Sequence, residues 1–271
     1  MQTTLFIPHP RRLLEGRFLA RYDRFIATVA LKDRTVEAHC VNPGRMEGLI
    51  RPGCRAWVSE APAGSKRKLL YTLELMEIDG IYIGVNTILP NLLAERLISE
   101  RLIPGLKRFQ TLRREVRYGD HSRIDILLEG RGRPHLVEVK NCHLVYPDGG
   151  AYFPDSVSAR AAGHLQALVA QVAEGKRATV LFVLQRRDGR LVRPSQLHDP
   201  TFAQAAQKAS KAGVRFRAVQ LDPRPEGFTY LGTLPVDVRP YDSTPLAPYR
   251  EALKDTSGWQ RRGRQVIPSS R

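Results

Sequence analysis

The sequence predicts a two-domain α+β protein, in which an N-terminal OB-like β-barrel precedes an α/β domain whose mixed sheet is flanked by helices. Two patterns support this order. Residues 18–85 consist of short apolar or alternating runs separated by turn residues, without a long helical period. From residue 86 onwards helical and strand patterns alternate, as in a sheet covered by helices. We place the first domain at residues 1–85, the second at residues 86–235 and a tail at residues 236–271.

Five strands are expected in the first domain, at residues 25–31, 35–41, 54–60, 69–78 and 81–85. Turn sequences such as Asn42-Pro43-Gly44 and Asp79-Gly80 separate them. Such a set of short strands in one small segment is typical of an OB-type barrel. This fold often binds nucleic acids, but a small barrel can also be an inert spacer, so the fold alone does not give the role.

The second domain opens with a helix at residues 86–101, followed by strands at residues 111–118, 123–128 and 136–140. The helix is predicted from apolar residues that recur on one face, namely Leu89, Leu92, Leu93, Leu97 and Ile98. The linker at residues 129–135 contains two Gly and a Pro, so it can fold the last two strands into a hairpin.

A second helix follows the loop at residues 147–154, with Asp155 or Ser156 as its cap and Gly175 at its end. Its buried stripe is expected at steps of three and four residues, formed by Val157, Ala161, Leu165, Leu168 and Val172. A continuous apolar strand at residues 178–184, a helix at 201–212 and a strand at 214–221 complete the domain.

The chain is strongly basic, with 43 Lys and Arg against 27 Asp and Glu and a formal charge of +16. Because the excess is spread along the chain, it favours a folded surface that binds a polyanion such as DNA. A basic surface without a specific partner is the alternative. The tail is rich in Pro, Ser and Arg and has no sustained period, so we expect it to be poorly ordered or held only locally.

The cysteines and the apolar runs limit the class of protein. Cys40, Cys54 and Cys142 are odd in number and widely spaced, which fits neither a disulfide framework nor a zinc site. No run approaches the roughly 18 apolar residues of a membrane span, and the apolar stretch near the N-terminus is too short for a signal peptide. We therefore expect a cytoplasmic protein.

The residues that indicate chemistry are Asp125, Glu138 and Lys140. Glu138 and Lys140 are two apart in an expected strand, so they project from the same face. Asp125 lies in the preceding strand between Ile124 and Ile126, which are expected on the opposite side from it. If the two strands form a hairpin, two carboxylates and one ammonium group meet on the sheet.

Hydrolysis of a phosphodiester needs such a set of charges. Asp125 and Glu138 can hold Mg²⁺ or Mn²⁺ as metal ligands, and the ion polarises the phosphoryl oxygen and acidifies a bound water. Lys140 can position that water or stabilise charge on the phosphate. A Glu-x-Lys step also occurs by chance, and this chain has a second one at 174–176, at a helix end. The alternative is a pair of surface carboxylates on an open sheet.

Further charged residues are candidates for supporting roles. Glu115 is a possible third carboxylate or an exposed strand residue, whereas Glu95 and Glu100 are possible outer ligands or, more simply, solvated helix charges. A polar line on the second helix, Arg160, His164 and Gln171, can face the carboxylates. For contacts with nucleic acid we single out Arg45, Lys66, Arg67, Lys68, Arg123, Arg160 and His164. The alternative for the run 66–68 is a solvated loop, and for His164 a structural histidine.

At this point the sequence resembles the sugar fermentation stimulation protein A family. The resemblance covers residues 18–236 and depends on RYDRFIATV, HCVNPGRMEG, KRKLLYTLEL, VNT, EVRYGDHSRIDILL, VEVKNC, YFPDSVSARAAGHLQAL and VLFVLQ. It implies an OB-like domain, a PD-(D/E)xK restriction-endonuclease-like domain and DNA binding, with Asp125, Glu138 and Lys140 matching the nuclease motif. This chain departs from the family pattern in having Pro43 after Asn42, and it lacks a Lys before His164 in the second helix.

Three hypotheses follow. The first is a metal-dependent nuclease that acts on DNA and uses the barrel to position the substrate. The second is a DNA-binding regulator of sugar metabolism that keeps the nuclease-like fold without catalysis. The third is a role on RNA, because OB barrels accept single strands of either kind.

Overall fold

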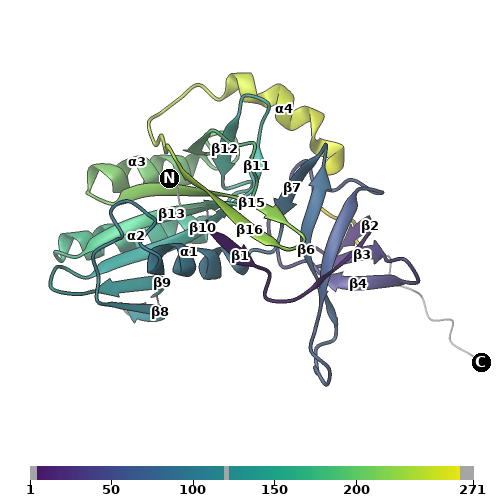
Figure 1. The fold of residues 1–271 in the computed structure, drawn as a ribbon. Helices are drawn as coiled ribbons and strands as arrows, with labels where there is room; N and C mark the ends of the chain where they lie inside the picture. The colour runs from purple at the N-terminus through teal and green to yellow at the C-terminus, as the bar shows by residue number, and fades with distance from the viewer. Residues whose placement is uncertain (1–4, 119–121, 263–271) are drawn as a thin grey trace, which may run out of the picture.

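The structure, a computed structural model, describes residues 5–118 and 122–262 (Figure 1). A six-stranded sheet is formed by the N-terminal part of the chain, and a seven-stranded sheet with helices on both faces is formed by the C-terminal part together with residues Phe6–Pro8. A small three-stranded sheet lies beside the second one. It consists of β11 (Leu144–Val145), β12 (Gly150–Phe153) and β14 (Leu191–Pro194).

The six-stranded sheet has the order β4-β3-β2-β5-β6-β7, and an additional pairing of β4 with β6 closes it into a ring. Its strands are β2 (Leu13–Tyr22), β3 (Ile26–Ala30), β4 (Thr35–His39), β5 (Arg55–Glu60), β6 (Tyr71–Ile78) and β7 (Ile81–Gly84). The five expected strands are confirmed. The first strand, β2, was not expected over most of its length, because Glu15, Gly16 and Arg17 interrupt its apolar alternation.

The interior of the ring is apolar. Phe18, Val29, Val58 and Leu73 come from four different strands and are almost completely buried in it. Gly16 permits a close approach between strands, since a Cβ atom there would lie 2.5 Å from the carbonyl oxygen of Ala30. Burial of these side chains is the main contribution to the stability of this part of the chain.

The seven-stranded sheet has the order β1-β16-β15-β13-β10-β9-β8. Its strands are β1 (Phe6–Pro8), β8 (Thr111–Tyr118), β9 (Ser122–Glu129), β10 (His135–Cys142), β13 (Arg177–Leu184), β15 (Arg215–Arg224) and β16 (Gly227–Leu234). The central strands β10, β13 and β15 are parallel, whereas the outer pairs are antiparallel. The predicted mixed sheet and the predicted β9–β10 hairpin are therefore confirmed.

Three helices cover the two faces of this sheet. On one face α1 (Leu89–Ser99) packs its Leu93 and Leu97 against Val137 and Leu181. The other face is covered by α2 (Ala159–Ala173) and α3 (Pro200–Lys211). Successive residues of β13 alternate between the two cores, which explains why this strand is apolar throughout.

Several boundaries differ from the expectations. The side chain of Ser158, not Asp155 or Ser156, caps α2 by accepting a hydrogen bond from Ala161 N. Val157 therefore lies before the helix and is 78% exposed, so it is not part of the buried stripe. Strand β1 pairs with β16 and belongs to the second sheet, although we assigned its residues to the first domain.

The tail was expected to be poorly ordered or held only locally, and this is wrong for residues 236–262. They form two 3₁₀ turns (Thr244–Leu246 and Lys254–Thr256) and the short helix α4 (Ala247–Ala252), which cross from the second sheet to the ring (Figure 1). Leu246 packs against Tyr146 and Tyr152. Near the end, Gly258 N donates to Arg45 O at 2.6 Å. Residues 263–271 lie outside the described part.

Candidate functional site

The candidate site is built where β9 and β10 separate. Their register extends from His135 opposite Leu128 to Val137 opposite Ile126. Beyond that point the Oδ2 atom of Asp125 accepts the backbone N–H of Val139 at 2.7 Å. The carboxylate of Asp125 thus takes the place of a backbone carbonyl as the acceptor for Val139 N, which holds this carboxylate directly beside Glu138.

The backbone alternation of β9 changes at Asp125, which corrects one expectation. Ile124 packs in the core below α2 and α3, whereas Ile126 packs in the core below α1. The two isoleucines therefore lie on opposite faces, not on the same one. On the neighbouring strand, Glu115 has a φ of +51°, and the register of β8 with β9 goes from Arg114 opposite Ile126 directly to Val116 opposite Ile124, so the sheet is irregular here.

Glu138 and Lys140 project together toward α2, as the two-residue spacing predicts. The Lys140 Nζ atom donates to Glu138 Oε1 at 2.7 Å, with the side chains 12% and 3% exposed. His164, on α2, donates from Nδ1 to the same Oε1 atom. The other oxygen of Glu138, Oε2, is buried and has no hydrogen-bond partner among the described residues. A buried carboxylate oxygen without a partner is costly, so this atom is a natural ligand for a cation.

Asn91 is a member of this cluster that the sequence analysis missed. It lies in the first turn of α1 and donates from Nδ2 to Asp125 Oδ1 at 3.0 Å. Both oxygens of Asp125 are therefore fixed, one by α1 and one by β10. The available signal was a single Asn among the apolar residues at the start of that helix.

The two carboxylates have opposite pKa shifts. Burial, and then the charge of Glu138, raise the pKa of Asp125 to about 6. Burial also disfavours the charged form of Glu138, but the hydrogen bond from His164 and the charge of Lys140 outweigh it and lower the pKa of Glu138. The cluster therefore holds one firmly ionised carboxylate and a second whose ionisation is resisted by the first. Added positive charge would favour ionisation of both.

His164 links Glu138 to the surface of α2. Its Nε2 atom accepts from Arg160 Nε at 3.4 Å while Nδ1 donates to Glu138, and one tautomer of the neutral ring satisfies both contacts. Arg160 is exposed beside it. Gln171 was expected on the same polar line, but it is buried near the end of α2 and donates to Glu174, so it does not reach the cluster.

The other acidic candidates do not join the cluster. Glu95 pairs with Arg114 at 3.1 Å, and Glu100 pairs with Arg96 at 2.8 Å. Glu115 is exposed on β8. Across residues 5–118 and 122–262, no three His, Cys, Asp or Glu side chains converge so that they could hold a metal ion by themselves. A cation bound by Asp125 and Glu138 would complete its shell with water and substrate oxygens.

The second Glu-x-Lys step lies elsewhere. Glu174 and Lys176 form an ion pair at 2.9 Å at the end of α2, and their side chains are 56% and 34% exposed. Gly175 between them has a φ of +88° and ends the helix, as expected. This pair is a surface contact and contains no Asp from a second strand.

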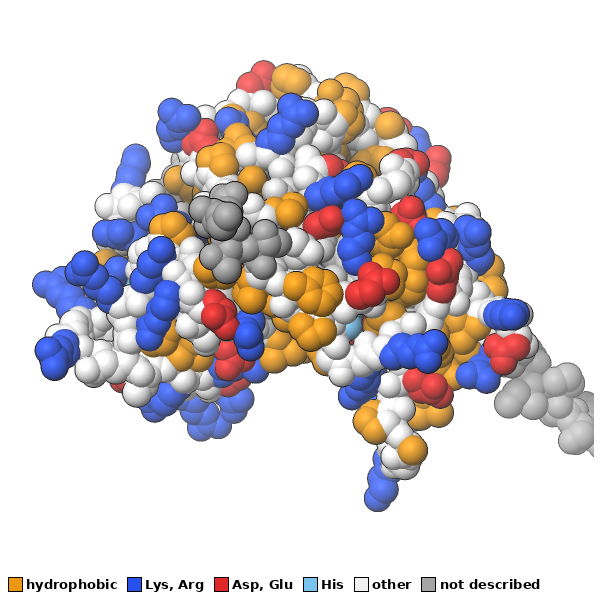
Figure 2. Space-filling model, in the orientation of Figure 1, with side chains coloured by type: hydrophobic (Ala, Val, Ile, Leu, Met, Phe, Trp, Pro, Cys, Tyr) orange, Lys and Arg blue, Asp and Glu red, His pale blue; other side chains and the backbone are white. Residues whose placement is uncertain are grey.

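The basic candidates are exposed, except for the partly buried His164, but they are dispersed. Lys66, Arg67 and Lys68 lie in the loop between β5 and β6, which protrudes from the ring with Lys and Arg side chains at its tip (Figure 2). Arg45 is exposed in a turn whose backbone is held by the C-terminal segment. Arg123 is exposed on β9 opposite Arg117. Only Arg160 and His164 adjoin the acidic cluster.

A buried Ser195–His198–Glu47 chain resembles a hydrolase triad in its connectivity. Ser195 Oγ and His198 Nδ1 are 2.9 Å apart, and His198 Nε2 is 2.8 Å from Glu47 Oε2. Tyr146 donates to the remaining Glu47 oxygen at 2.5 Å. Ser195 is only 1% exposed, so no substrate reaches it. These three hydrogen-bonded residues instead join the ring to the second domain.

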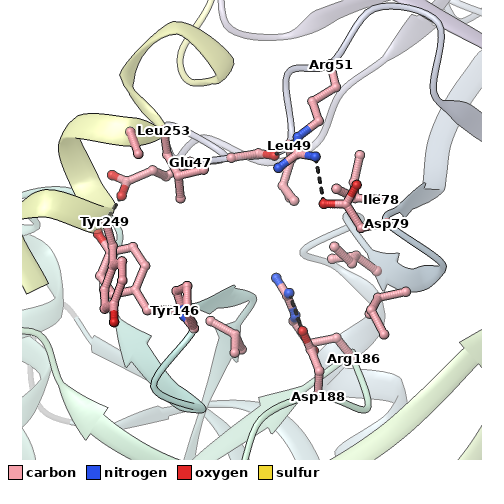
Figure 3. Close-up of a pocket in the computed structure, with 16 residues that line it drawn as sticks. Glu47, Leu49, Arg51, Ile78, Asp79, Tyr146, Arg186, Asp188, Tyr249 and Leu253 are labelled. Carbon is pink, nitrogen blue, oxygen red and sulfur yellow. Dashed lines mark hydrogen bonds and ion pairs between the residues drawn. The ribbon is translucent and has the colours of Figure 1, made fainter.

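A cavity of about 280 Å³ lies between the ring, the loop after β11 and α4 (Figure 3). Its two arginines are already paired, since Arg51 lies 2.7 Å from Asp79 and Arg186 lies 2.6 Å from Asp188. None of its lining residues belongs to the acidic cluster. We therefore do not assign the chemistry to this cavity.

Comparisons with known proteins give the family. A family model described as "Sugar fermentation stimulation protein RE domain" matches residues 88–227, and one described as "SfsA N-terminal OB domain" matches residues 19–85. A sugar fermentation stimulation protein homolog of Maricaulis maris is 45% identical over 80% of this chain and 92% of its own length. Its counterpart in Thioalkalivibrio sulfidiphilus is 44% identical over 83% and 96%.

A solved structure described as Pyrococcus furiosus SfsA in complex with Ca²⁺ is also similar. It has a TM-score of 0.76 and 30% identity, covering 85% of this chain and 98% of that one. None of the helices described in this chain has the length and apolar character needed to cross a bilayer. The first part of the chain is an OB domain, the second is an α/β domain, and the chain belongs to the sugar fermentation stimulation protein family.

Proposed function

We propose that this chain is a DNA-binding, divalent-metal-dependent nuclease of the PD-(D/E)xK class, which hydrolyses phosphodiester bonds. One observation carries the proposal. Asp125, Glu138 and Lys140, from two adjacent strands, meet where those strands part, and one buried Glu138 oxygen has no hydrogen-bond partner among the residues that the structure describes. The order of helix, antiparallel hairpin and flanking helix around this cluster supports a nuclease-like assignment, as does the name of the matching family model.

The residues fit a hard divalent cation. Asp125 and Glu138 would hold it, because Glu138 Oε2 has no hydrogen-bond partner in the described part of the chain, and because burial, and then the charge of Glu138, raise the pKa of Asp125. The similar structure from Pyrococcus furiosus was solved with Ca²⁺, and we propose Mg²⁺ or Mn²⁺ as the ion used in catalysis. When bound, such an ion supplies Lewis-acid polarisation of the phosphoryl oxygen and a more acidic water.

The surrounding side chains have distinct tasks. Lys140 is 12% exposed and hydrogen-bonded to Glu138, so its remaining N–H groups can orient a water or stabilise charge on a phosphate oxygen. Asn91 and Val139 N fix both oxygens of Asp125. His164 orients Glu138, and Arg160 beside it can contact a phosphate of the same strand.

The bulk charge supports nucleic acid as the partner. With a formal charge of +16, the surface attracts a polyanion before any specific contact forms. DNA is the partner we propose, and an RNA strand would meet the same charges. The exposed loop at residues 65–68 and Arg123 provide phosphate contacts on different parts of the surface.

The test is metal-dependent cleavage of single-stranded, duplex and branched DNA, with and without Mn²⁺. The chain offers matched controls, because Glu174 and Lys176 repeat the Glu-x-Lys step on the surface. Glu138→Gln and Lys140→Met are expected to lower the cleavage rate about 100-fold or more, whereas Glu174→Gln and Lys176→Met leave it unchanged. If clean wild-type protein cleaves none of these substrates, the nuclease assignment is wrong.

One observation favours a second function, that of a DNA-binding regulator without catalysis. In the described part of the chain no three His, Cys, Asp or Glu side chains are placed to hold a metal ion, because His164 Nδ1 is bound to Glu138, and Lys140 already pairs with Glu138. For such a regulator we expect DNA affinity that falls steeply with salt, is unchanged in Glu138→Gln, and is accompanied by no cleavage.

A further inference from the structure

A groove of about 420 Å³ lies between the ring and the start of α1. Three segments meet there: the N-terminal arm with Arg11, the ring strands with His39 and Glu74, and the Asn86–Leu89 connection into α1. Its volume is within the range of pockets that hold small organic ligands. It is distinct from the acidic cluster, with which it shares no lining residue.

We propose that this groove binds one nucleotide of a substrate strand, with the base between its apolar walls and the phosphate on Arg67. The inference rests on the proposed function, because it names the part of the substrate that lies next to the cleaved bond. Its substrate class is therefore a strand with an unpaired nucleotide, as in single-stranded DNA, a frayed end or a branch.

The rim of the groove carries the positive charges of Arg11 and Arg67, which also act on Glu74 in the floor. Arg67 Nη2 donates to Thr72 Oγ1 at 3.1 Å, and Arg11 Nη1 donates to Glu60 O at 3.4 Å. Neither arginine is ion-paired with a carboxylate within residues 5–118 and 122–262. The neighbours Lys66 and Lys68 are exposed in the same loop but do not line the groove. Arg67 therefore differs from Lys66 and Lys68 in that it lines the groove, not in its charge.

The floor of the groove is polar, buried and internally satisfied. Glu74 is 8% exposed and accepts from Ser59 Oγ at 2.6 Å and from Asn86 Nδ2 at 2.7 Å. Burial raises the pKa of Glu74 despite these bonds. Both Glu74 oxygens therefore accept a hydrogen bond from within the protein. These bonds hold Ser59, Glu74 and Asn86 in fixed positions, where the edge of a base can meet them.

The walls suit a planar apolar ring. Leu13, Val41 and Leu89 line the groove, and Ile88 stands at its edge with 58% of its surface exposed. An isoleucine so exposed beside a polar floor is available for apolar contact with a base face, as aliphatic side chains make with unstacked bases. Aliphatic walls with a few convergent polar groups are the usual composition of a small-ligand pocket.

The groove is close to the acidic cluster along the chain. Ile88 precedes α1, and three residues later Asn91 holds Asp125. Three residues of helix rise about 4.5 Å, so a strand whose base occupies the groove passes near Asp125 within a few nucleotides. The outline of the molecule is hollowed on one side between the protruding β5–β6 loop and the second sheet (Figure 2).

Two pairs of substitutions test the inference with a fluorescein-labelled single-stranded oligonucleotide that contains one 2-aminopurine. Arg67→Glu and Lys68→Glu change the net charge equally, but only Arg67 lines the groove. We expect Arg67→Glu to weaken binding about tenfold more than Lys68→Glu does. Ile88→Ser is expected to reduce the 2-aminopurine fluorescence change, whereas Leu92→Ser, one turn further along α1 and also exposed, leaves it unaltered.

The outcomes separate the possibilities. If wild-type protein binds the oligonucleotide but Arg67→Glu and Lys68→Glu weaken it equally, the groove inference is wrong and the proposed function stands. If no oligonucleotide binds, the proposed function itself fails. Competition by free deoxyadenosine monophosphate shows whether the groove binds a free nucleotide or a nucleotide within a strand. We expect it not to compete at millimolar concentration, and competition lost in Arg67→Glu would identify a free-nucleotide site and overturn the assignment to a strand.

Discussion

Asp155 joins the two domains, and its removal should lower stability by an amount that depends on pH. Its Oδ2 atom accepts from Met46 N at 3.0 Å and lies 3.4 Å from His143 Nε2. The side chain rests on Gly44, where a Cβ atom would lie 2.4 Å from Asp155 Oδ1. Burial alone would raise the pKa of Asp155, but His143 and the Met46 N–H outweigh burial and lower it to about 2.

The size of this stability loss follows from the linkage between folding and the protonation of Asp155. The pKa falls from 3.8 to about 2 on folding, and one pKa unit corresponds to about 1.4 kcal/mol, so the charged form contributes about 2 kcal/mol. Because the folded pKa is the lower one, this contribution is fully present above pH 4 and is lost as the pH falls toward 2. Asp155→Asn should therefore lower the free energy of unfolding by about 2 kcal/mol at pH 7.

Urea unfolding of both proteins between pH 2 and pH 7 measures this difference. Asp79→Asn is a suitable control, since Asp79 is 77% exposed and its pairing with Arg51 should contribute little. We expect the difference between wild type and Asp155→Asn to shrink between pH 4 and pH 2. A difference that stays constant across this range would refute the electrostatic reasoning and leave only a packing effect.

Three further predictions concern the cation, its support and the C-terminal segment. Mn²⁺ at 100 times its dissociation constant should raise the free energy of unfolding by about 2.7 kcal/mol; calorimetry should show this gain in wild type and not in Glu138→Gln. Asn91→Ala should weaken Mn²⁺ binding about tenfold in titration calorimetry, because it frees Asp125 Oδ1; an unchanged affinity would remove Asn91 from the site. Leu246→Ala should cost about 3 kcal/mol in urea unfolding, since Leu246 is 5% exposed against Tyr146 and Tyr152; a loss below 1 kcal/mol would mean that this segment is not docked.

The sequence was sufficient to predict strands and the direction of their side chains where periodicity and local chemistry agree. The run at 178–184 predicted a strand covered on both faces, and β13 contributes to the cores on both sides. The two-residue spacing placed Glu138 and Lys140 on one face because strand geometry leaves no alternative. The strand that contains Asp125 was also predicted from its residue pattern. The irregular backbone at Asp125, which places Ile124 and Ile126 on opposite faces, was not predicted.

Contacts between distant segments could not be predicted. Asp155 looked like a helix cap, yet it is bound by Met46 N, 109 residues away. Asn91 gave only a weak local signal, because its role depends on how α1 packs beside β9. The last strand was expected to end at residue 221, whereas β15 continues through Asp222 and Arg224 and returns as β16.

The tail was misjudged for a related physical reason. Its composition lacks a helical or strand period, but order here comes from docking, not from local propensity. Leu246 inserts beside two tyrosines of the second domain, and Trp259 lies against Arg21 and Arg24 of the ring. Composition alone does not reveal that complementary surfaces exist elsewhere in the chain.

The most direct measurement is anomalous diffraction from a crystal of the wild-type protein soaked in Mn²⁺. We expect one strong peak within about 2.2 Å of Glu138 Oε2 and of an Asp125 oxygen, and we expect it to be absent from crystals of Glu138→Gln. A fully occupied peak elsewhere, or no peak at these carboxylates at millimolar Mn²⁺, would contradict the claim that Asp125 and Glu138 together bind the ion.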